Sequence, residues 1–251
     1  MSGHSKWSTI KRKKGAIDAA RGKVFTKVIK EITVAARIGG GDMEANPRLR
    51  MAVQSAKGNN MPADNITRAI KKGTGELEGV SYEEITYEGY GPGGIALIIE
   101  SMTDNRNRTV ADLRHLLTKN GGNLAESNAV MWNFERKGVF TVSKASFSED
   151  DLMNVILDAG ADDLTEEDEF FEITSSIENF DKVRKALESS SLPGLKIESG
   201  SLQYVPKTET KVEGKDAETA VKLISAIEDY DDVQNVYSNA DIDEKVMEAM
   251  S

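Results

Sequence analysis

Apolar residues at helical spacing dominate the first part of the chain. From Lys23 onward they recur at intervals of three and four, which predicts an amphipathic helix. The residues concerned are Phe25, Val28, Ile29, Ile32 and Ala36. The glycines at 39–41 end this helix, because glycine readily adopts the left-handed backbone of a helix C-cap.

Two further helices are predicted. Asn46-Pro47 begins the first, with proline in the first turn, where its missing N–H is not needed. Met61-Pro62 precedes the second, which ends at Lys71-Lys72-Gly73. Residues 1–22 are polar and basic without an apolar period, so we expect an arm that is loosely ordered when alone. Residues 1–80 are therefore predicted to be a basic arm and a small helical domain.

From Tyr82 the apolar period drops towards two. The segments EEITYEG and GIALIIES are predicted to be strands joined by the turn GYGPGG. Thr109, with Asp112 in the capping-box position, is predicted to be the N-cap of a helix that Gly121-Gly122 ends. AVMWNFER is predicted as the next strand.

A second α/β unit follows. Its predicted elements are the strand GVFTVSK, a helix capped by Ser148, a short strand near residues 162–165, the strand FFEITSS, a helix around Phe180 and the strand LKIESGSLQYVP. This is the β-α-β-β-α-β order of a ferredoxin-like fold. The last helix, DAETAVKLISAIED, and the last strand, VQNVYSN, have no partners of their own. We therefore expect them to complete the first α/β unit.

The predicted fold class is α+β, with a small N-terminal helical domain followed by two ferredoxin-like α/β domains, the third inserted in the second. The predicted ranges are 1–80 for the arm and helical domain, 81–135 with 205–240 for the middle domain, 136–204 for the inserted domain and 241–251 for a tail.

Charge is divided unevenly along the chain. Residues 1–80 contain 16 Lys and Arg against 7 Asp and Glu, a net charge of +9, whereas the remainder contains 16 against 35, a net charge of −19. Such asymmetry indicates different partners for different parts of a chain. A basic domain suits a polyanion, because Lys and Arg release counterions from phosphates without requiring a base sequence. The alternative is that the surplus charge serves only solubility.

The candidate nucleic-acid-binding residues of the basic domain are cations of the arm and of the first helix, together with one aromatic residue. They are Lys6, Trp7, Lys11, Arg12, Lys13, Lys14, Arg21, Lys23, Lys27, Lys30 and Arg37. The helix cations fall on another face than the apolar stripe, so one face can pack while the other meets phosphates. Trp7 has two interpretations, stacking on an exposed base or pinning the arm to the helical domain.

TDNRNRT adds two candidates, Arg106 and Arg108, at a predicted strand-to-helix junction. Backbone N–H groups at a helix start, beside two arginines, can bind a phosphate. The alternative is that this segment caps the helix and that its arginines pair with nearby acids such as Asp104.

Other chemistry has little support in the sequence. There are no cysteines, which excludes disulfides and thiolate sites and fits a reducing cytoplasm. No apolar run approaches 18 residues, so we expect no membrane association. G-x-G-x-x-G at Gly89, Gly91 and Gly94 precedes a strand rather than a helix, which favours a hairpin over a dinucleotide site. The acidic residues 162–169 lack calcium-loop spacing and favour a solvated turn.

Catalysis is not expected. The chain has two histidines, His4 and His115, and no nucleophile-elbow, zinc-protease or P-loop motif. We therefore predict a non-enzymatic protein without a cofactor or a metal, and a monomer is favoured.

Several long segments together resemble the YebC/PmpR family. They are MSGHSKWSTIKRKKGAIDAARGKVFTKVIKEI, NNMPADNITRAIKKGTGE, YEGYGPGG, TDNRNRT and DVQNVYSN, and they span essentially the whole chain. The resemblance implies a three-domain cytoplasmic protein with the third domain inserted in the second. It implies a transcriptional regulator that binds DNA or, alternatively, a translation factor that binds ribosomal RNA on the ribosome and relieves stalling at proline-rich sequences.

Three functional hypotheses therefore stay open. The first is a DNA-binding regulator that uses its basic N-terminal domain, and the second is the ribosome-associated factor. The residues themselves lean towards recognition of shape or RNA, because the helical domain has few Asn or Gln on a single face to read base edges. The third is a module whose arm binds an acidic protein.

Overall fold

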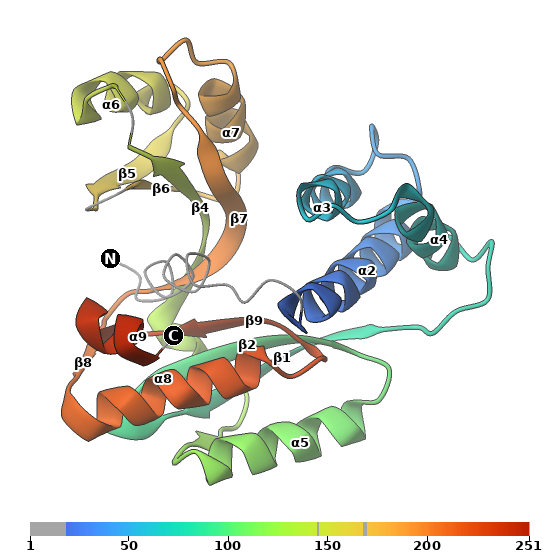
Figure 1. The fold of residues 1–251 in the computed structure, drawn as a ribbon, viewed down its shortest axis with the longest axis vertical. Coiled ribbons are helices and arrows are strands. Elements are labelled where there is room, and N and C mark those ends of the chain that lie inside the picture. The colour runs from blue at the N-terminus through green and yellow to red at the C-terminus, as the bar shows by residue number, and fades with distance from the viewer. Residues whose placement is uncertain (1–18, 145, 168–169, 251) are drawn as a thin grey trace. The chain divides into compact units, whose positions relative to one another are not determined.

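The computed structural model of the protein describes residues 19–144, 146–167 and 170–250, and Figure 1 shows their fold. The described residues fall in two compact units. One contains residues 19–130 together with 209–250, and the other is Met131–Thr208. The predicted fold class is confirmed: a helical region is followed by two α/β domains, and the second α/β domain is inserted in the first.

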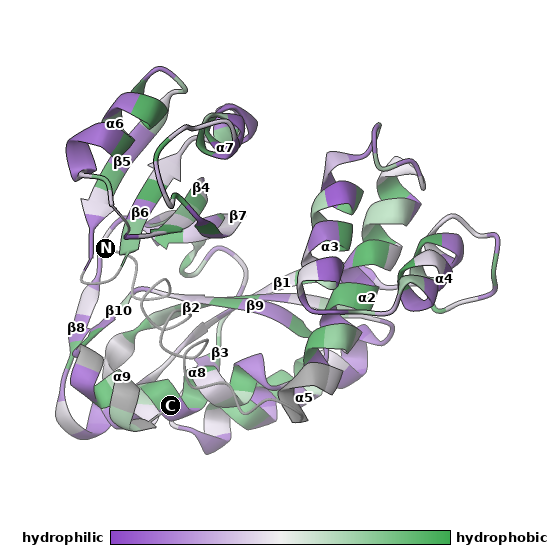
Figure 2. Cartoon of the chain, turned by 45° about the horizontal axis from the view of Figure 1, so that its top comes forward, coloured by the Kyte–Doolittle hydropathy of each residue, from purple (hydrophilic) through white to green (hydrophobic). Residues whose placement is uncertain are grey.

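Three helices form the N-terminal domain: α2 (Ala19–Gly39), α3 (Pro47–Gly58) and α4 (Ala63–Gly73). Their apolar faces meet in one core, which includes Ile32 of α2, Leu49 and Val53 of α3 and Ile66 of α4. The predicted apolar stripe of α2 is confirmed, since Phe25, Val28 and Ile29 pack against this core. The ribbon of α4 alternates between hydrophilic and hydrophobic residues, as expected for a helix with one packed face (Figure 2).

The middle domain is an antiparallel sheet with strand order β3-β1-β2-β9. Its strands are β1 (Glu83–Tyr90), β2 (Ala96–Thr103), β3 (Asn123–Leu124) and β9 (Val233–Ser238). Two helices, α5 (Arg106–Lys119) and α8 (Gly214–Glu228), share one hydrophobic core with the sheet, and both lie on the same side of it (Figure 1). Two short parallel strands, β8 (Thr210–Val212) and β10 (Ala240–Ile242), and a last helix, α9 (Glu244–Met250), complete the domain.

The turn between β1 and β2 is the glycine-rich segment. Pro92–Gly94 form a short 3-10 helix, η1, and Gly91 N–H donates to the Ile95 carbonyl at 2.9 Å. Gly93 and Gly94 have φ values of 74° and 76°, a conformation that favours glycine. The glycines therefore make the hairpin turn that the sequence predicts.

The nested arrangement follows from one strand pairing. β9 comes after the inserted residues in the sequence, yet it pairs antiparallel with β2, with Leu97 opposite Ser238 and Ile99 opposite Val236. Core residues of α8, such as Leu223 and Ile227, pack in the same cluster as Leu113 of α5. The final helix and strand thus complete the first α/β domain.

The inserted unit has the ferredoxin-like topology. Its elements are β4 (Phe134–Ser143), α6 (Glu149–Leu157), β5 (Ala161–Glu166), β6 (Phe170–Ser175), α7 (Phe180–Glu188) and β7 (Ile197–Pro206). They form an antiparallel sheet with the order β5-β6-β4-β7. Ser148 caps α6, as predicted, and the structure adds a full capping box with Asp151. Phe140 and Phe180 stack in the core with ring centroids 4.7 Å apart.

Two predicted details are wrong. AVMWNFER is not a separate strand: Met131–Asn133 form a 3-10 helix, η2, and Phe134 begins β4, which continues through the predicted strand GVFTVSK to Ser143. The inserted unit begins here because the buried side chain of Asn133 bonds to the backbone at its other end. It donates to the Thr208 carbonyl at 2.9 Å and accepts from Thr208 N–H at 3.1 Å. These bonds join the two ends of the insertion.

The second error concerns the N-cap of α5. The cap is Asn105, whose side-chain oxygen accepts from Arg108 N–H at 3.0 Å, and Thr109 lies inside the helix. Asn is at least as good an N-cap as Thr, so the earlier residue starts the helix. None of the helices in the described part of the chain has the length and the apolar character that crossing a membrane requires.

Candidate nucleic-acid interface

Three lysines of α2 reach the segment that joins α8 to β9. Their spacing, at positions 23, 27 and 30, puts them on one side of the helix. Lys23 Nζ lies 3.5 Å from an Asp229 carboxylate oxygen, and Lys27 Nζ donates to the Glu228 carbonyl at 2.8 Å. The basic side of α2 therefore faces acids and carbonyls of the middle domain.

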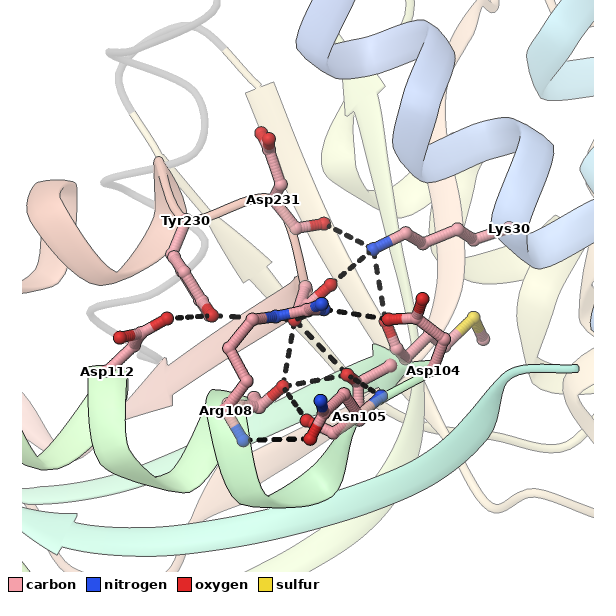
Figure 3. A network of polar contacts seen from close by, with 11 residues as sticks. Lys30, Asp104, Asn105, Arg108, Asp112, Tyr230 and Asp231 are labelled. Carbon is pink, nitrogen blue, oxygen red and sulfur yellow. Dashed lines mark hydrogen bonds and ion pairs between the residues drawn. The ribbon is translucent and has the colours of Figure 1, made fainter. Parts of the chain in front are cut away.

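Lys30 makes the innermost of these contacts. Only 6% of the residue is exposed, and its ammonium donates to Asp232 Oδ1 at 2.7 Å. It also donates to the carbonyls of Asp231 at 2.9 Å and Met102 at 3.2 Å. Figure 3 shows Lys30 extending from α2 into this polar network. Three acceptors around one ammonium satisfy its hydrogen-bonding capacity, as a buried charge requires.

Asp232 is the acceptor that the surrounding elements share. Besides Lys30, it accepts from Arg108 Nη2 at 2.9 Å, Thr109 Oγ1 at 2.8 Å and Thr103 Oγ1 at 3.2 Å. Burial alone would raise the pKa of this carboxyl, but the hydrogen bonds from Arg108, Lys30 and Thr109 outweigh it and lower the pKa to about 2. Asp232 is therefore ionised at neutral pH and holds α2, β2 and α5 together.

The start of α5 belongs to the same network. Arg108 Nη2 also donates to Asp104 at 2.8 Å, and hydrogen bonds to Asp232 and Asp104 raise the pKa of its guanidinium. The hydroxyl of Tyr230 donates to Asp112 at 2.6 Å (Figure 3). Burial, and after it this hydrogen bond, raises the pKa of the Tyr230 phenol to about 12. Arg108 thus makes the acid pairing that the sequence offers as the alternative to a phosphate contact.

Arg106, the other arginine of this segment, is different. It is exposed, and none of the described groups bonds to its side chain. Arg106 thus remains available to an outside ligand.

Two arginines add further links from the helical domain, one to the residues just before β1 and one to β1 itself. Arg37 donates to Ser81 Oγ and to the Tyr82 carbonyl, both at 2.6 Å. Arg48 of α3 donates to Glu31 at 2.7 Å and to Glu84 of β1 at 2.6 Å. Both bonds raise the pKa of the Arg48 guanidinium, and the bond to Glu31 has the larger effect.

The remaining predicted residues cannot be placed. Lys6, Trp7, Lys11, Arg12, Lys13 and Lys14 lie outside the described residues, and Arg21 is described only through the backbone of α2. The prediction that they contact nucleic acid stays a prediction, as do the two interpretations of Trp7.

Metal chemistry gains no support from the described residues, which contain no group of three or more His, Cys, Asp or Glu arranged to hold a metal ion. Two acids of the run 162–169 instead pair with lysines: Asp162 lies 3.3 Å from Lys137 Nζ, and Glu166 lies 2.7 Å from Lys144 Nζ.

Comparison with known proteins identifies the family. Residues 5–76 match the model of the TACO1/YebC protein N-terminal domain, and residues 82–240 match that of the TACO1/YebC second and third domain. The chain belongs to the TACO1/YebC family. This confirms the resemblance predicted from the sequence. The boundary between the two matches falls just after α4, beside the Ser81 and Tyr82 contacts of Arg37.

Relatives in the TACO1/YebC family match along all or nearly all of their length. A probable transcriptional regulatory protein of Desulforapulum autotrophicum is 58% identical over 250 residues and covers 100% of both chains. One of Chlorobaculum parvum is 56% identical over 251 residues, covering 100% of this chain and 99% of the relative. The crystal structure of a conserved hypothetical protein from Aquifex aeolicus matches with a TM-score of 0.82 and 44% identity, over 90% of this chain and 93% of that one.

Four cations of this TACO1/YebC protein's helical domain were missed as candidates. Lys57 near the end of α3 and Arg68, Lys71 and Lys72 of α4 are exposed, and none of the described groups bonds to their charged atoms. The sequence signal was available: Arg68, Lys71 and Lys72 stand three and four positions apart, on the face of α4 opposite Ile66 and Ala69.

Proposed function

We propose that this protein is a regulator of gene expression that binds nucleic acid through its basic N-terminal domain, with DNA as the primary partner. The observation that carries the proposal is the charge division, net +9 in residues 1–80 against −19 in the remainder. A basic domain on an acidic body attracts a polyanion to one end of the chain only. Full-length relatives called probable transcriptional regulatory proteins support the same role.

The protein acts by binding rather than by catalysis. The perturbed ionisable groups of the described residues, Asp232 and Arg108 foremost, satisfy one another within the fold. Catalytic groups with strongly shifted pKa values face a substrate cleft, whereas this network joins packed elements. Phosphates repel the acidic α/β domains, so these domains stay out of the nucleic-acid contact and are available for protein partners.

One observation favours a second candidate, a translation factor that binds ribosomal RNA. The exposed face of α4 presents Arg68, Lys71 and Lys72, while the one amide side chain of this helix, Asn65, is half-buried. Direct readout of DNA uses Asn, Gln and Arg against base edges in the major groove. A face built mainly of cations contacts phosphates without reading bases, so it suits ribosomal RNA as well as the DNA backbone.

The test is binding of the full chain to duplex DNA, to a ribosomal RNA fragment and to ribosomes across a salt series. We expect the logarithm of the association constant to fall linearly with the logarithm of salt concentration. Replacing Lys11, Arg12, Lys13 and Lys14 by alanine should make that slope shallower. Absence of binding to all three partners at low salt would refute the proposal. Crosslinking in cells then separates the candidates, since promoter DNA and ribosomal RNA are recovered as different sequences.

A further inference from the structure

The described cations of the helical domain divide into two groups. Ten lysines and arginines between residues 23 and 80 have described side chains. Six of them contact oxygen atoms of the protein within 4.0 Å: Lys23, Lys27, Lys30, Arg37, Arg48 and Arg50. Five of the six contact the middle domain, whereas Arg50 pairs within the helical domain, with Glu44.

The second group consists of Lys57, Arg68, Lys71 and Lys72. All four are exposed, and no described group lies within hydrogen-bond or ion-pair distance of their charged atoms. Asp64 stands four positions before Arg68, yet it does not form an ion pair with it. The segment 54–73 contains these four cations and a single acid, Asp64, so its net charge is +3.

Packing holds the cations of α4 on the solvent side. Ile66 and Ala69 are buried in the helical core, and the carbonyl of Ala69 lies 3.4 Å from Thr33 Oγ1 of α2. Gly73 lies so close to α2 that an added Cβ would collide with the Thr33 carbonyl. With this side of α4 fixed on α2, the positions of Arg68, Lys71 and Lys72 must face outward.

Lys72 is further restrained by its own stem. A Cβ added at Gly79 would lie 3.2 Å from Cβ, Cγ and Cδ of Lys72, so the methylene chain rests against the backbone of Gly79. The contact restricts the rotamers of Lys72 before any ligand binds. Binding therefore costs this side chain less conformational entropy. No described group bonds to the ammonium beyond it, which is exposed to an incoming anion.

We propose that the exposed face of α4 binds the phosphate backbone of duplex DNA, while the basic side of α2 holds the helical domain on the middle domain. This inference rests on the proposed function and specifies the surface that performs it. Arg68 and Lys72 stand one helical turn apart, about 6 Å along the axis, so they can contact successive phosphates. Phosphate contacts of this kind position a protein without selecting a sequence.

The experiment compares the full chain with Arg68→Ala, Lys71→Ala and Lys72→Ala combined. Alanine preserves helix propensity at these exposed positions, so the fold should be retained. A matched control is Arg114→Ala, Lys119→Ala and Lys222→Ala combined. These are also one arginine and two lysines on α5 and α8, and they are exposed and bonded to none of the described groups. Both variants change the net charge by the same amount. Circular dichroism and thermal unfolding check that each is folded.

The probes are a mixed-sequence DNA duplex and a ribosomal RNA fragment, each titrated over a salt series. We expect the α4 variant to lose about 2.7 from the salt slope for DNA, about 0.9 for each phosphate contact removed, and the control to keep the wild-type slope. A charge-preserving variant, Arg68→Lys with Lys71→Arg and Lys72→Arg, should bind DNA as the wild type does.

The outcomes separate this inference from the proposed function. If the wild type binds neither probe at low salt, the proposed function itself is wrong. If the wild type binds DNA and the α4 variant keeps its slope, the α4 surface is wrong and the function stands. Loss of RNA binding with DNA binding intact would overturn the assignment of duplex DNA to this face. An equal loss in the control variant would show a net-charge effect and would also overturn the inference.

Discussion

At the scale of single residues, Asp232 determines how the helical and middle domains meet. Its carboxylate accepts from Lys30 of α2, Thr103 of β2 and Arg108 and Thr109 of α5. A carboxylate so enclosed needs its donors, because an unpaired buried charge costs several kcal/mol. Lys30 and Asp232 are 202 positions apart in the sequence, so only the folded chain makes this pair.

The lowered pKa of Asp232 predicts acid sensitivity. A folded pKa of about 2 against an ordinary value of 3.8 means that the carboxylate stabilises the fold above about pH 4 and loses this effect as pH falls towards 2. Asp232→Asn should therefore lower the melting temperature strongly at pH 6, and the difference from the wild type should shrink between pH 4 and 2. Thermal unfolding across this range measures it. A difference that stays constant down to pH 2 would contradict the prediction.

At the scale of elements, Asn46 makes the turn between α2 and α3. It is buried; its side-chain oxygen accepts from Leu49 N–H at 3.1 Å, and its amide donates to the carbonyls of Ala35 and Gly40, both at 2.9 Å. The side chain thus caps the start of α3 and satisfies two carbonyls at the end of α2. The sequence predicted that a helix begins at Asn46-Pro47, but it did not reveal the cap made by the Asn46 side chain or the two carbonyls that its amide contacts.

Asn46→Ala should destabilise the protein by about 2 to 3 kcal/mol, since it removes the cap and leaves two carbonyls without a donor. Asn46→Asp keeps a capping oxygen but loses both donors and buries a negative charge beside the carbonyls. We expect it to be no more stable than the alanine variant, as measured by urea unfolding. Recovery of wild-type stability in Asn46→Asp would mean that the cap alone matters.

The same scale explains the two misassigned elements. Thr109 followed by Asp112 is a good capping pattern, but Asn105 is a better cap four residues earlier, and Thr109 is then buried with its hydroxyl on Asp232. AVMWNFER has the apolar content of a strand. Asn133 is nevertheless bonded to Thr208, so the segment closes the insertion instead of pairing in the middle sheet. The error at AVMWNFER comes from a partner distant in the sequence, whereas the cap of α5 is decided locally, by Asn105 and Arg108.

At the scale of the whole molecule, the inserted unit has its own core. Phe140, Leu152, Phe180 and Val183 are buried within Met131–Thr208, and all four strands of its sheet belong to this range. The bonds between Asn133 and Thr208 tie its two ends together. Such a unit has what an autonomously folding domain requires.

We therefore expect a fragment of residues 131–208 to fold by itself and to unfold in a single cooperative transition. Circular dichroism and amide dispersion in an NMR spectrum would check this. Removing the end contact with Asn133→Ala should lower the midpoint of the fragment without abolishing the transition. A fragment lacking cooperative unfolding would show that this unit depends on the rest of the chain.

The sequence by itself determined most of the local elements and turns, because these depend on neighbouring residues and on periodicity. It also indicated the nesting, through a final helix and strand without partners of their own, and the family, through its long motifs. It also determined the division of charge between a basic domain and an acidic body. The tertiary structure alone decided which cations of that domain are used inside the fold. Lys23, Lys27 and Lys30 meet residues 228–232 only because β9 joins the middle sheet. Charge pairing follows the packing of distant elements, so the lysines of α2 are used inside the fold, whereas Arg68, Lys71 and Lys72 of α4 stay exposed and bond to no described group.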